Sequence, residues 1–405
     1  MVATLEEIDK KYNLRPFVDA PESKVDIPNK IELEAIDFSM YKEGSEGLES
    51  RQKLAKQLEI ALTDYGFFKV VGHGISEETF NKLKAITQSI FELPADEKAK
   101  YLAGTYPIEQ EKNSDLGIVS GVGFKPRGHW TYVKGVTDEL EFINFRHFLH
   151  DEIYYNTPYP EFVQWHLSDI QAYFKYLHLQ VLRKVLTLMD IILEIPEGTL
   201  YGNYFKPIPE IEKSGSGVAR LLVYHPTSAN YQLKTNQTWM RGHTDGSGLT
   251  FIASQPLLAL QIQDRNTKQW NYVSHTPNAL VVNVGDAISH LSGGYFKSAI
   301  HRVATPPSDQ QGYRRETIIY FSNPRLDTVV DPEEINSKKL ERIGFGFNQE
   351  WEKCTYQEWR NAKTNFFNRK SATQKKTLTL FGRPSVMSII EPAPGTGTID
   401  APQKV

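Results

Sequence analysis

The feature that most constrains the fold is a run of short, β-rich segments between residues 218 and 322. About seven or eight such segments, rich in Val, Ile, Leu, Thr and Tyr, follow one another there with turn signals between them. Short strands at such close spacing favour a double sheet of the jelly-roll type over a parallel sheet with crossover helices. The sequence therefore predicts a mainly β protein with helical flanks, built on a double-stranded β-helix, or cupin-like, core.

Changes in composition along the chain predict four segments. Residues 1–30 form an irregular lead-in, and residues 31–214 form an N-terminal helical and α+β region. That region includes a stretch at 103–160, rich in Gly, Pro and Tyr and without clear periodicity, which we expect to be a loop assembly that contacts substrate. Residues 215–325 form the β core, and residues 326–405 form a C-terminal helical flank with a flexible tail.

Three helices are expected before the β core. One is capped by Ser50 and stopped by Gly66, and a second, amphipathic helix begins at Ser76. The longest helix is predicted between residues 166 and 195, where a capping-box pattern begins at Ser168.

The overall composition excludes several classes of protein. The chain has 46 Lys+Arg and 49 Asp+Glu, a net charge of −3, which argues against a general nucleic-acid binder. Its one cysteine, Cys354, excludes intrachain disulfides and cysteine-based zinc or iron–sulfur sites. The first residues lack the apolar core of a signal peptide, and no apolar run approaches the roughly 18 residues of a membrane span. We expect a soluble, cytoplasmic protein that binds neither nucleic acid nor membrane; the oligomeric state is left open.

A metal site is indicated by His243-Thr244-Asp245, the one His-x-Asp sequence in the chain. In an extended segment residues i and i+2 point to the same face, so His243 and Asp245 can direct a nitrogen and a carboxylate oxygen toward one point. Such a pair suits a divalent cation such as Fe(II), and a third ligand would complete a facial triad with open positions for reactants. His301, on an apolar strand 56 residues after Asp245, is the candidate third ligand. Taken alone, the His-x-Asp sequence is explained as well by a surface turn, and a lone histidine such as His301 is more often a buried core residue.

An anion-binding pair follows on the strand that begins near Arg315. By strand alternation Arg315 and Thr317 share one face, while Arg314 and Glu316 point the other way. A guanidinium and a hydroxyl at this spacing can bind a carboxylate, and a buried arginine needs an anion to offset its desolvation. The alternative is an internal Arg–Glu ion pair.

Two other patterns are interpreted as structural. His150-Asp151-Glu152 is a His-x-Glu sequence, but it lies in a polar loop with no strand pattern after it. Gly121-Val122-Gly123 lacks the spacing and the strand–helix context of a dinucleotide-binding loop.

At this point the sequence resembles the iron(II)- and 2-oxoglutarate-dependent dioxygenases, in particular the branch with isopenicillin N synthase and the plant and fungal 2-oxoglutarate oxidases. The resemblance covers roughly residues 30–325. Five segments carry it in order along the chain: ALTDYGFFKVVGHGI with FELPADEK, GVGFKPRGHWTYVKGVTDELEFINF, GHTDGSGLTFIASQ, NALVVNVGDAISHLSGGYFKSAIHRV, and the Arg-x-Thr strand.

The resemblance implies that His243, Asp245 and His301 ligate Fe(2+), and that Arg315 and Thr317 bind the distal carboxylate of the co-substrate 2-oxoglutarate. A tyrosine of the family that contacts this carboxylate corresponds either to His225 or, after a one-residue slip, to Tyr224. The implied reaction uses O2 to hydroxylate, desaturate or cyclise a small organic molecule and releases succinate and CO2.

Two alternatives to that function stay open. One is an iron oxidase of the isopenicillin N synthase type that does not use 2-oxoglutarate, and the other is a regulatory sensor that retains the fold. Four residues of the variable loop, which are as readily explained by packing, are candidates to line the substrate pocket: Phe124, Lys125, Arg127 and Tyr132.

Overall fold

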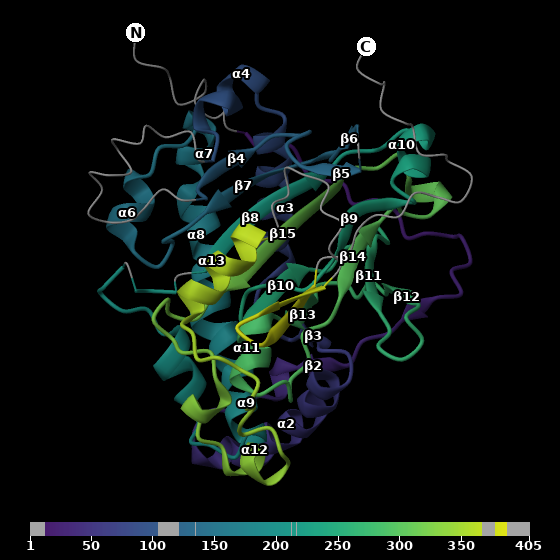
Figure 1. Ribbon diagram of the computed structural model, residues 1–405. Coiled ribbons are helices and arrows are strands. Elements are labelled where there is room, and N and C mark those ends of the chain that lie inside the picture. The colour runs from purple at the N-terminus through teal and green to yellow at the C-terminus, as the bar shows by residue number, and fades with distance from the viewer. Residues whose placement is uncertain are drawn as a thin grey trace, which may run out of the picture.

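Two β-sheets face each other across the centre of the computed structural model, which describes residues 13–103, 121–133, 135–211, 213–215, 217–366 and 377–386 (Figure 1). The major sheet has eight strands in the order β2-β3-β13-β10-β15-β8-β7-β4, and the minor sheet has five in the order β1-β12-β11-β14-β9. All neighbours pair antiparallel except β1 with β12 and β2 with β3. The protein is mainly β with helical flanks, as predicted, and its sheets are mixed and not closed.

The strands of the two sheets and of two short hairpins have these bounds: β1 Lys30–Ile31, β2 Ala35–Asp37, β3 Phe67–Val71, β4 Gly123–Lys125, β5 Thr131–Val133, β6 Val136–Thr137, β7 Leu140–Phe145, β8 Val218–Tyr224, β9 Thr238–His243, β10 Leu249–Ala253, β11 Leu260–Gln263, β12 Trp270–Val273, β13 Leu280–Val284, β14 His301–Ala304, β15 Arg315–Ser322, β16 Thr377–Leu380 and β17 Arg383–Val386. Eight of them, β8 to β15, fall in the segment where the sequence predicts about that number.

The helices flank the sheets and have these bounds: α2 Leu48–Thr63, α3 Glu77–Phe91, α4 Ala95–Lys98, α6 Asp151–Asn156, α7 Glu161–Trp165, α8 Leu167–Tyr176, α9 Arg183–Ile192, α10 Ala229–Lys234, α11 Asp286–Leu291, α12 Lys338–Arg342 and α13 Tyr356–Phe366. Figure 1 shows α9, α2 and α12 gathered at one end of the molecule and α13 lying in front of the sheets.

The largest apolar core lies between the major sheet and the N-terminal helices. Helix α3 begins where Ser76 accepts a hydrogen bond from the Thr79 amide at 3.1 Å, as predicted. Its buried stripe, which includes Phe80, Leu83 and Ile86, packs with the outer faces of β8 and β15. One face of the major sheet is thereby covered, and the opposite face is left to form a cavity with the minor sheet.

The starts of the other two predicted helices are displaced by one to three residues. Helix α2 begins at Leu48 after Gly47, so Ser50 lies inside its first turn, where its hydroxyl bonds the Met40 carbonyl. The long helix begins at Leu167, which places Ser168 inside it as well. A π-helical segment, Leu177–Leu182, joins α8 to α9. Both cap predictions were wrong because a serine in a first turn has the same sequence signature as an N-cap.

The prediction that 103–160 is a loop assembly was wrong in part. Residues 104–120 lie outside the described residues, but β4 and β7 extend the major sheet beyond β8. All six residues of β7 are buried, so the alternation that marks a half-exposed strand is missing from its sequence. The C-terminal flank likewise holds a β16–β17 hairpin as well as helices, and the predicted flexible tail lies outside the described residues.

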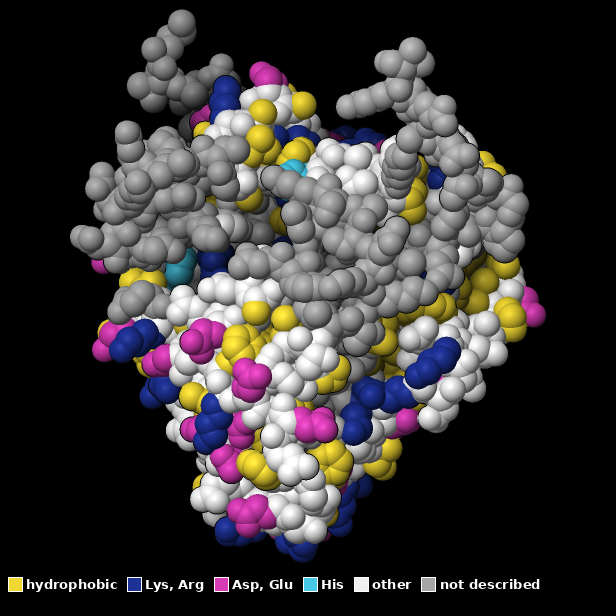
Figure 2. All heavy atoms as spheres, viewed as in Figure 1, with side chains coloured by type: hydrophobic (Ala, Val, Ile, Leu, Met, Phe, Trp, Pro, Cys, Tyr) yellow, Lys and Arg dark blue, Asp and Glu magenta, His cyan; other side chains and the backbone are white. Residues whose placement is uncertain are grey.

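Strands from both sides of the predicted boundary at residue 214 share the major sheet. β3 pairs with β13, and β7 pairs with β8. The four-segment division itself stays a prediction. No helix within the described ranges combines the length and the apolar character needed to cross a membrane. Figure 2 shows Lys and Arg side chains interspersed with Asp and Glu at the end of the molecule where α2, α9 and α12 lie.

We expect one buried hydrogen bond to matter for stability. The Tyr320 hydroxyl of β15 lies 2.6 Å from Nδ1 of His178 in the π-helical segment, and both side chains are fully buried. Tyr320→Phe leaves a buried ring nitrogen without this partner, so the free energy of unfolding should fall by about 1–3 kcal/mol. Urea denaturation monitored by circular dichroism measures it. The exposed Tyr313→Phe is the matched control, and equal stability of both variants would contradict the assigned role.

Candidate metal site

Three metal-ligating side chains converge between the two sheets. One ligand atom each from His243, Asp245 and His301 lies within 4.8 Å of the others. Nε2 of His243 is 3.5 Å from Oδ1 of Asp245, and Nε2 of His301 is 3.7 Å from Oδ2. No other group of this kind occurs among the residues that the structure describes. The three residues singled out from the sequence are therefore neighbours in space.

Strand pairing brings the two histidines together. His301, the first residue of β14, is paired in register with His243, the last residue of β9, and their ring centroids are 4.4 Å apart. The chain then turns through Gly246–Gly248 into β10 of the major sheet. At Gly248 a Cβ would lie 2.6 Å from the Phe205 ring, so this turn needs glycine there.

Hydrogen bonds orient each candidate ligand. Nδ1 of His243 is 2.7 Å from the Arg241 carbonyl, and Nδ1 of His301 is 3.1 Å from the Ala299 carbonyl. Carbonyls accept only, so each Nδ1 carries a proton, and Nε2 is the ring nitrogen that remains to ligate a metal. Burial lowers the pKa of His301 to about 4, which keeps this ring neutral at pH 7.

Side chains of the major sheet orient the carboxylate of Asp245 through hydrogen bonds. Its Oδ2 accepts hydrogen bonds from the Thr250 hydroxyl at 2.7 Å and from the Asn283 amide at 3.0 Å. Burial opposes ionisation, but the neighbouring imidazoles and the Asn283 amide hold the pKa of Asp245 well below its usual value. Two imidazole nitrogens and one ionised carboxylate form the donor set of a 2-His-1-carboxylate iron(II) site.

The site opens into a cavity of about 830 Å³ whose walls come from both sheets and from α13. Arg315 and Thr317 line this cavity, Arg315 is 4% exposed, and its Nη1 donates to the Thr317 hydroxyl at 2.9 Å. Nε of Arg315 has no hydrogen-bond partner among the described residues. The Arg–Glu ion pair, which the sequence offered as the alternative role of this strand, is made by Arg314 and not by Arg315: the Arg314 guanidinium lies 2.8 Å from the Glu316 carboxylate.

Strand alternation places Tyr224 rather than His225 in the cavity. Tyr224 lines it, and the Arg315 guanidinium lies 5.5 Å from the Tyr224 ring centroid. His225 points away from the cavity and pairs with Glu141 at 2.9 Å.

Most of the remaining sequence candidates lie outside the cavity. In the His150-Asp151-Glu152 sequence, Nε2 of His150 is 3.4 Å from the Ser214 hydroxyl, and Asp151 pairs with Lys175. These contacts agree with the interpretation of this sequence as structural. None of the four loop residues proposed to line the pocket does so: Lys125 pairs with Asp138, Arg127 with Glu139, and Phe124 and Tyr132 are packed in apolar clusters. Gly121, from the other pattern, lies at the cavity wall.

Several cavity-lining polar residues were not found from the sequence: Asn144, Arg146, Arg220, Arg360 and Lys363. Alternation in Phe142-x-Asn144-x-Arg146 would have pointed to the first two, had β7 been recognised as a strand. Arg360 and Lys363 of α13 could not be found from the sequence, because no regular spacing connects a helix after the β core to the strands that it covers.

Two C-terminal elements, α13 and β17, form hydrogen bonds with the loop that carries the metal ligands. Nζ of Lys363 lies 2.6 Å from Oδ2 of Asp286 and 2.9 Å from the carbonyl of Thr244, the residue between His243 and Asp245. The amide of Thr244 donates to the Val386 carbonyl in β17 at 3.3 Å. α13 and β17 therefore hold the loop that presents the two ligands.

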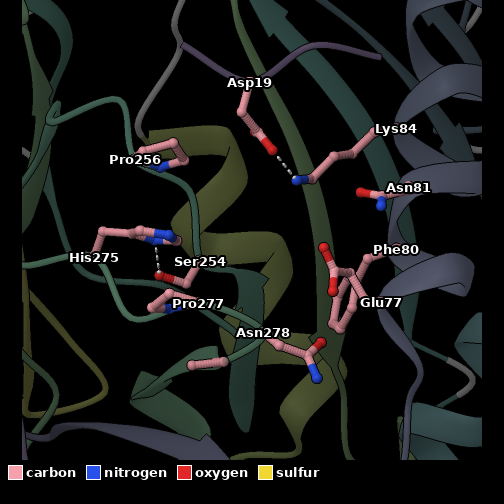
Figure 3. Close-up of a pocket in the computed structure, with 11 residues that line it drawn as sticks. Asp19, Glu77, Phe80, Asn81, Lys84, Ser254, Pro256, His275, Pro277 and Asn278 are labelled. Atoms are coloured by element: carbon pink, nitrogen blue, oxygen red, sulfur yellow. Dashed lines mark hydrogen bonds and ion pairs between the residues drawn. The ribbon is translucent and has the colours of Figure 1, made fainter. Parts of the chain in front are cut away.

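A second pocket, of about 240 Å³, lies between α3 and the loops after β10 and β12 (Figure 3). Its polar side chains partly pair with one another: Lys84 with Asp19 at 2.6 Å and Ser254 with His275 at 2.9 Å. It holds no grouping of metal ligands like that of the larger cavity, within the described part of the chain.

Two family models match the chain. Residues 33–162 match the N-terminal domain described as non-haem dioxygenase in morphine synthesis, and residues 215–324 match the 2OG-Fe(II) oxygenase superfamily. The second match contains all three candidate metal ligands together with Arg315 and Thr317. α13 lies outside both matches.

Similar proteins agree with the family models. A 2-oxoglutarate-dependent dioxygenase of Monascus ruber is 27% identical over 78% of this chain and 90% of its own. Gibberellin 2-beta-dioxygenase 7 of Arabidopsis thaliana is 25% identical over 82% of this chain and 83% of its own. The structure of a full-length Neurospora crassa protein in complex with alpha-KG and thymine superposes with a TM-score of 0.65, at 19% identity, over 84% of this chain and 99% of that one.

The chain therefore belongs to the 2-oxoglutarate- and iron(II)-dependent oxygenase superfamily, whose members have a jelly-roll core. It is a 2-oxoglutarate-dependent dioxygenase of small-molecule metabolism, with Fe(2+), 2-oxoglutarate and O2 as its cofactors. The prediction of 2-oxoglutarate dependence is confirmed over the alternative of an oxidase without this co-substrate.

The hydroxyl of Thr250 should tune metal affinity. Thr250→Val keeps the shape of the side chain but removes one of the two hydrogen bonds that orient Asp245, so we expect divalent metal binding to weaken by about 10- to 100-fold. Titration calorimetry with Mn(II) under anaerobic conditions measures this. Thr187→Val removes a comparable buried hydroxyl, bonded within α9 at 2.9 Å, and should leave the affinity unchanged. Unchanged binding in Thr250→Val would show that this hydrogen bond has no such role.

Proposed function

We propose that His243, Asp245 and His301 hold iron(II), and that Arg315 and Thr317 bind the distal carboxylate of 2-oxoglutarate in the same cavity. There the protein oxidises a small organic metabolite by hydroxylation, desaturation or ring closure. The observation that carries this proposal is the convergence of three ligand atoms within 4.8 Å, with a buried guanidinium in the same cavity.

The hydrogen bonds around Thr317 support a carboxylate at this place. Its hydroxyl oxygen accepts from Arg315 at 2.9 Å and from the Gln255 amide at 3.3 Å. Both lone pairs are used in this way, so the hydroxyl hydrogen is left to donate to an anion. The guanidinium and the hydroxyl together form a two-point carboxylate receptor.

Burial of Arg315 also supports an anionic ligand. Desolvation lowers the pKa of this guanidinium, although the group stays protonated. A buried charge is destabilising unless an anion meets it, and the carboxylate of 2-oxoglutarate meets this requirement. Tyr224, whose ring lies beside the guanidinium, is the third proposed contact in place of His225.

When bound, iron(II) and 2-oxoglutarate supply the oxidative decarboxylation that activates O2 and releases succinate and CO2. The residues of the chain prepare that chemistry. Backbone carbonyls fix the tautomers of the two histidines, and Thr250 and Asn283 hold the carboxylate in one orientation. Apolar side chains of both sheets, Ile252, Leu260, Val303 and Ile319, line the same cavity and exclude water from the reacting groups.

The printed names of relatives support a small-molecule substrate. They include a gibberellin dioxygenase and a leucoanthocyanidin dioxygenase, and one similar structure holds thymine. These small molecules differ greatly from one another. We therefore expect this chain to resemble those proteins in the residues that bind iron and 2-oxoglutarate, and to differ from them in the residues that contact the substrate.

Anaerobic spectroscopy tests the proposed co-substrate site. Addition of Fe(II) and then 2-oxoglutarate should produce a visible charge-transfer band, and admission of O2 should produce succinate. Because a guanidinium–carboxylate pair contributes about 1.5–3 kcal/mol, Arg315→Gln should raise the concentration of 2-oxoglutarate that half-saturates the band by about 10- to 100-fold.

Arg302→Gln is the control for this experiment. Arg302 lies on β14, stacks on Trp270 at 4.4 Å and bonds Gln261 at 2.7 Å, and it does not line the cavity. This variant should saturate like the parent protein. A band that forms normally in Arg315→Gln would refute the carboxylate receptor, and failure of His301→Gln to lower Fe(II) affinity would refute the metal site.

A further inference from the structure

Lys363 of α13 lies in the wall of the larger cavity, but its ammonium group is fully bonded to the protein. Nζ of Lys363 is 2.6 Å from Oδ2 of Asp286, 2.9 Å from the Thr244 carbonyl and 3.3 Å from the Thr244 hydroxyl. A lysine ammonium has three N–H donors, and these three acceptors use all of them. Lys363 therefore acts on the loop that carries His243 and Asp245, and not on a molecule in the cavity.

Asp286, the ionic partner of Lys363, is bonded to the same loop at two places. Its carboxylate accepts a hydrogen bond from the Thr244 hydroxyl at 3.1 Å, and its backbone amide donates to the Asp245 carbonyl at 2.7 Å. The Ser298 hydroxyl donates to the other carboxylate oxygen at 2.6 Å. Asp286 is 2% exposed, so its negative charge needs a cation close by, and Lys363 supplies that cation. Without the ammonium, a buried charge would remain beside the loop that carries the metal ligands.

The inner face of α13 packs against this loop. Tyr356, Trp359 and Lys363 are spaced three and four residues apart, so they share one face of the helix. Trp359 is fully buried, and the Lys363 ammonium lies 5.2 Å from its ring centroid. A Cβ at Gly246, next to the carboxylate ligand, would lie 3.5 Å from the Trp359 ring and 3.8 Å from Cδ of Lys363. The helix is thus within contact distance of the turn that follows the ligands.

The same helix supplies part of the cavity wall. Tyr356, Arg360, Lys363 and Thr364 all line the cavity. The Tyr356 hydroxyl donates to Oδ1 of Asn323, just after β15, at 2.8 Å, which fixes the start of the helix against the major sheet. Docking of α13 therefore completes this wall and, through Lys363, holds the metal-ligand loop at the same time.

We propose that Lys363 is a positioning residue of the metal site, through which docking of α13 raises the affinity for the metal and metal binding in turn holds α13 in place. Coupling of this kind is reciprocal: a helix that tightens metal binding when it is docked is itself stabilised by the metal, by the same factor. Loading of the metal then also completes the cavity wall. The inference rests on the proposed metal site and adds to it a link with the C-terminal helix.

The direction of the change in metal affinity separates positioning from a simple effect of charge. A positive charge near a dication repels it, so electrostatics alone predicts that removal of the Lys363 ammonium strengthens metal binding. Loss of positioning predicts the opposite. We expect Lys363→Met to weaken Mn(II) binding by about 10- to 100-fold, the usual effect of losing a residue that orients metal ligands.

Two further variants at this position separate the loss of bonds from the loss of the folded structure. Lys363→Arg keeps the charge and several donors, so it should recover most of the affinity for Mn(II). Lys363→Gln keeps donors for Asp286 without the charge, and it replaces the methionine variant if that variant does not fold. It should weaken binding in the same direction by a smaller factor.

Two measurements on the full-length protein without metal, made under anaerobic conditions, test the proposal. Titration calorimetry with Mn(II) gives the affinities. Hydrogen exchange followed by mass spectrometry reports the docking of α13, because local opening exposes the helix amides. In the parent protein Mn(II) should slow exchange in peptides that cover residues 356–366, and in Lys363→Met this slowing should be lost. Exchange in β10 and β13 without metal should be the same in both proteins, which shows that the core stays folded.

Lys84→Met is the matched control. Lys84 also lies on a helix, pairs with Asp19 at 2.6 Å, and has a side chain that is 15% exposed, against 12% for Lys363 (Figure 3). It lines the second pocket and not the cavity that holds the metal ligands. Lys84→Met should therefore bind Mn(II) as the parent protein does.

Three results would overturn the inference: the uncharged variants of Lys363 bind Mn(II) at least as tightly as the parent protein, Mn(II) slows exchange in α13 equally in parent and variant, or Lys84→Met weakens binding as much as Lys363→Met does. The parent protein distinguishes this failure from failure of the proposed function. A parent that binds no Mn(II), or binds it equally well after His301→Gln, refutes the metal site. A parent that loses Mn(II) binding in His301→Gln but not in Lys363→Met refutes only the role of Lys363.

Discussion

The register of β9 against β14 is the constraint on which the site depends. Pairing His301 with His243 sets two imidazoles side by side at the edge of the minor sheet, with ring centroids 4.4 Å apart. A slip of one residue would turn either imidazole to the opposite face of its strand. The carboxylate comes from the turn that follows β9, and its orientation is fixed by Thr250 and Asn283 of the major sheet. The site therefore exists only when the two sheets are correctly apposed, which couples folding of the core to metal binding.

The sequence predicted the β core and the candidate ligands for a physical reason. Close strand spacing and alternation are local properties, so the eight strands between 218 and 322 and the common face of Arg315 and Thr317 could be inferred from neighbouring residues. The choice between Tyr224 and His225 needed the strand register, which alternation alone does not fix. The two helix caps failed because a serine in the first turn resembles an N-cap.

The walls of the cavity were harder to predict because they depend on contacts between distant segments. β7 is buried on both faces and lacks alternation, so Arg146 was not recognised as a cavity residue. α13 crosses to the cavity from a segment beyond both family matches, and no local pattern connects Arg360 or Lys363 to the residues they meet. The part of the site that lies on alternating strands was thus accessible from sequence, whereas the outer walls of the cavity required the fold.

Anomalous diffraction from crystals grown anaerobically with Fe(II) and 2-oxoglutarate tests the central claim most directly. Data collected on both sides of the iron absorption edge should show one strong peak per chain, within bonding distance of Nε2 of His243, Nε2 of His301 and a carboxylate oxygen of Asp245. Density for 2-oxoglutarate should extend from that peak to the guanidinium of Arg315. An iron peak at any other place, or 2-oxoglutarate bound away from Arg315, would contradict the account.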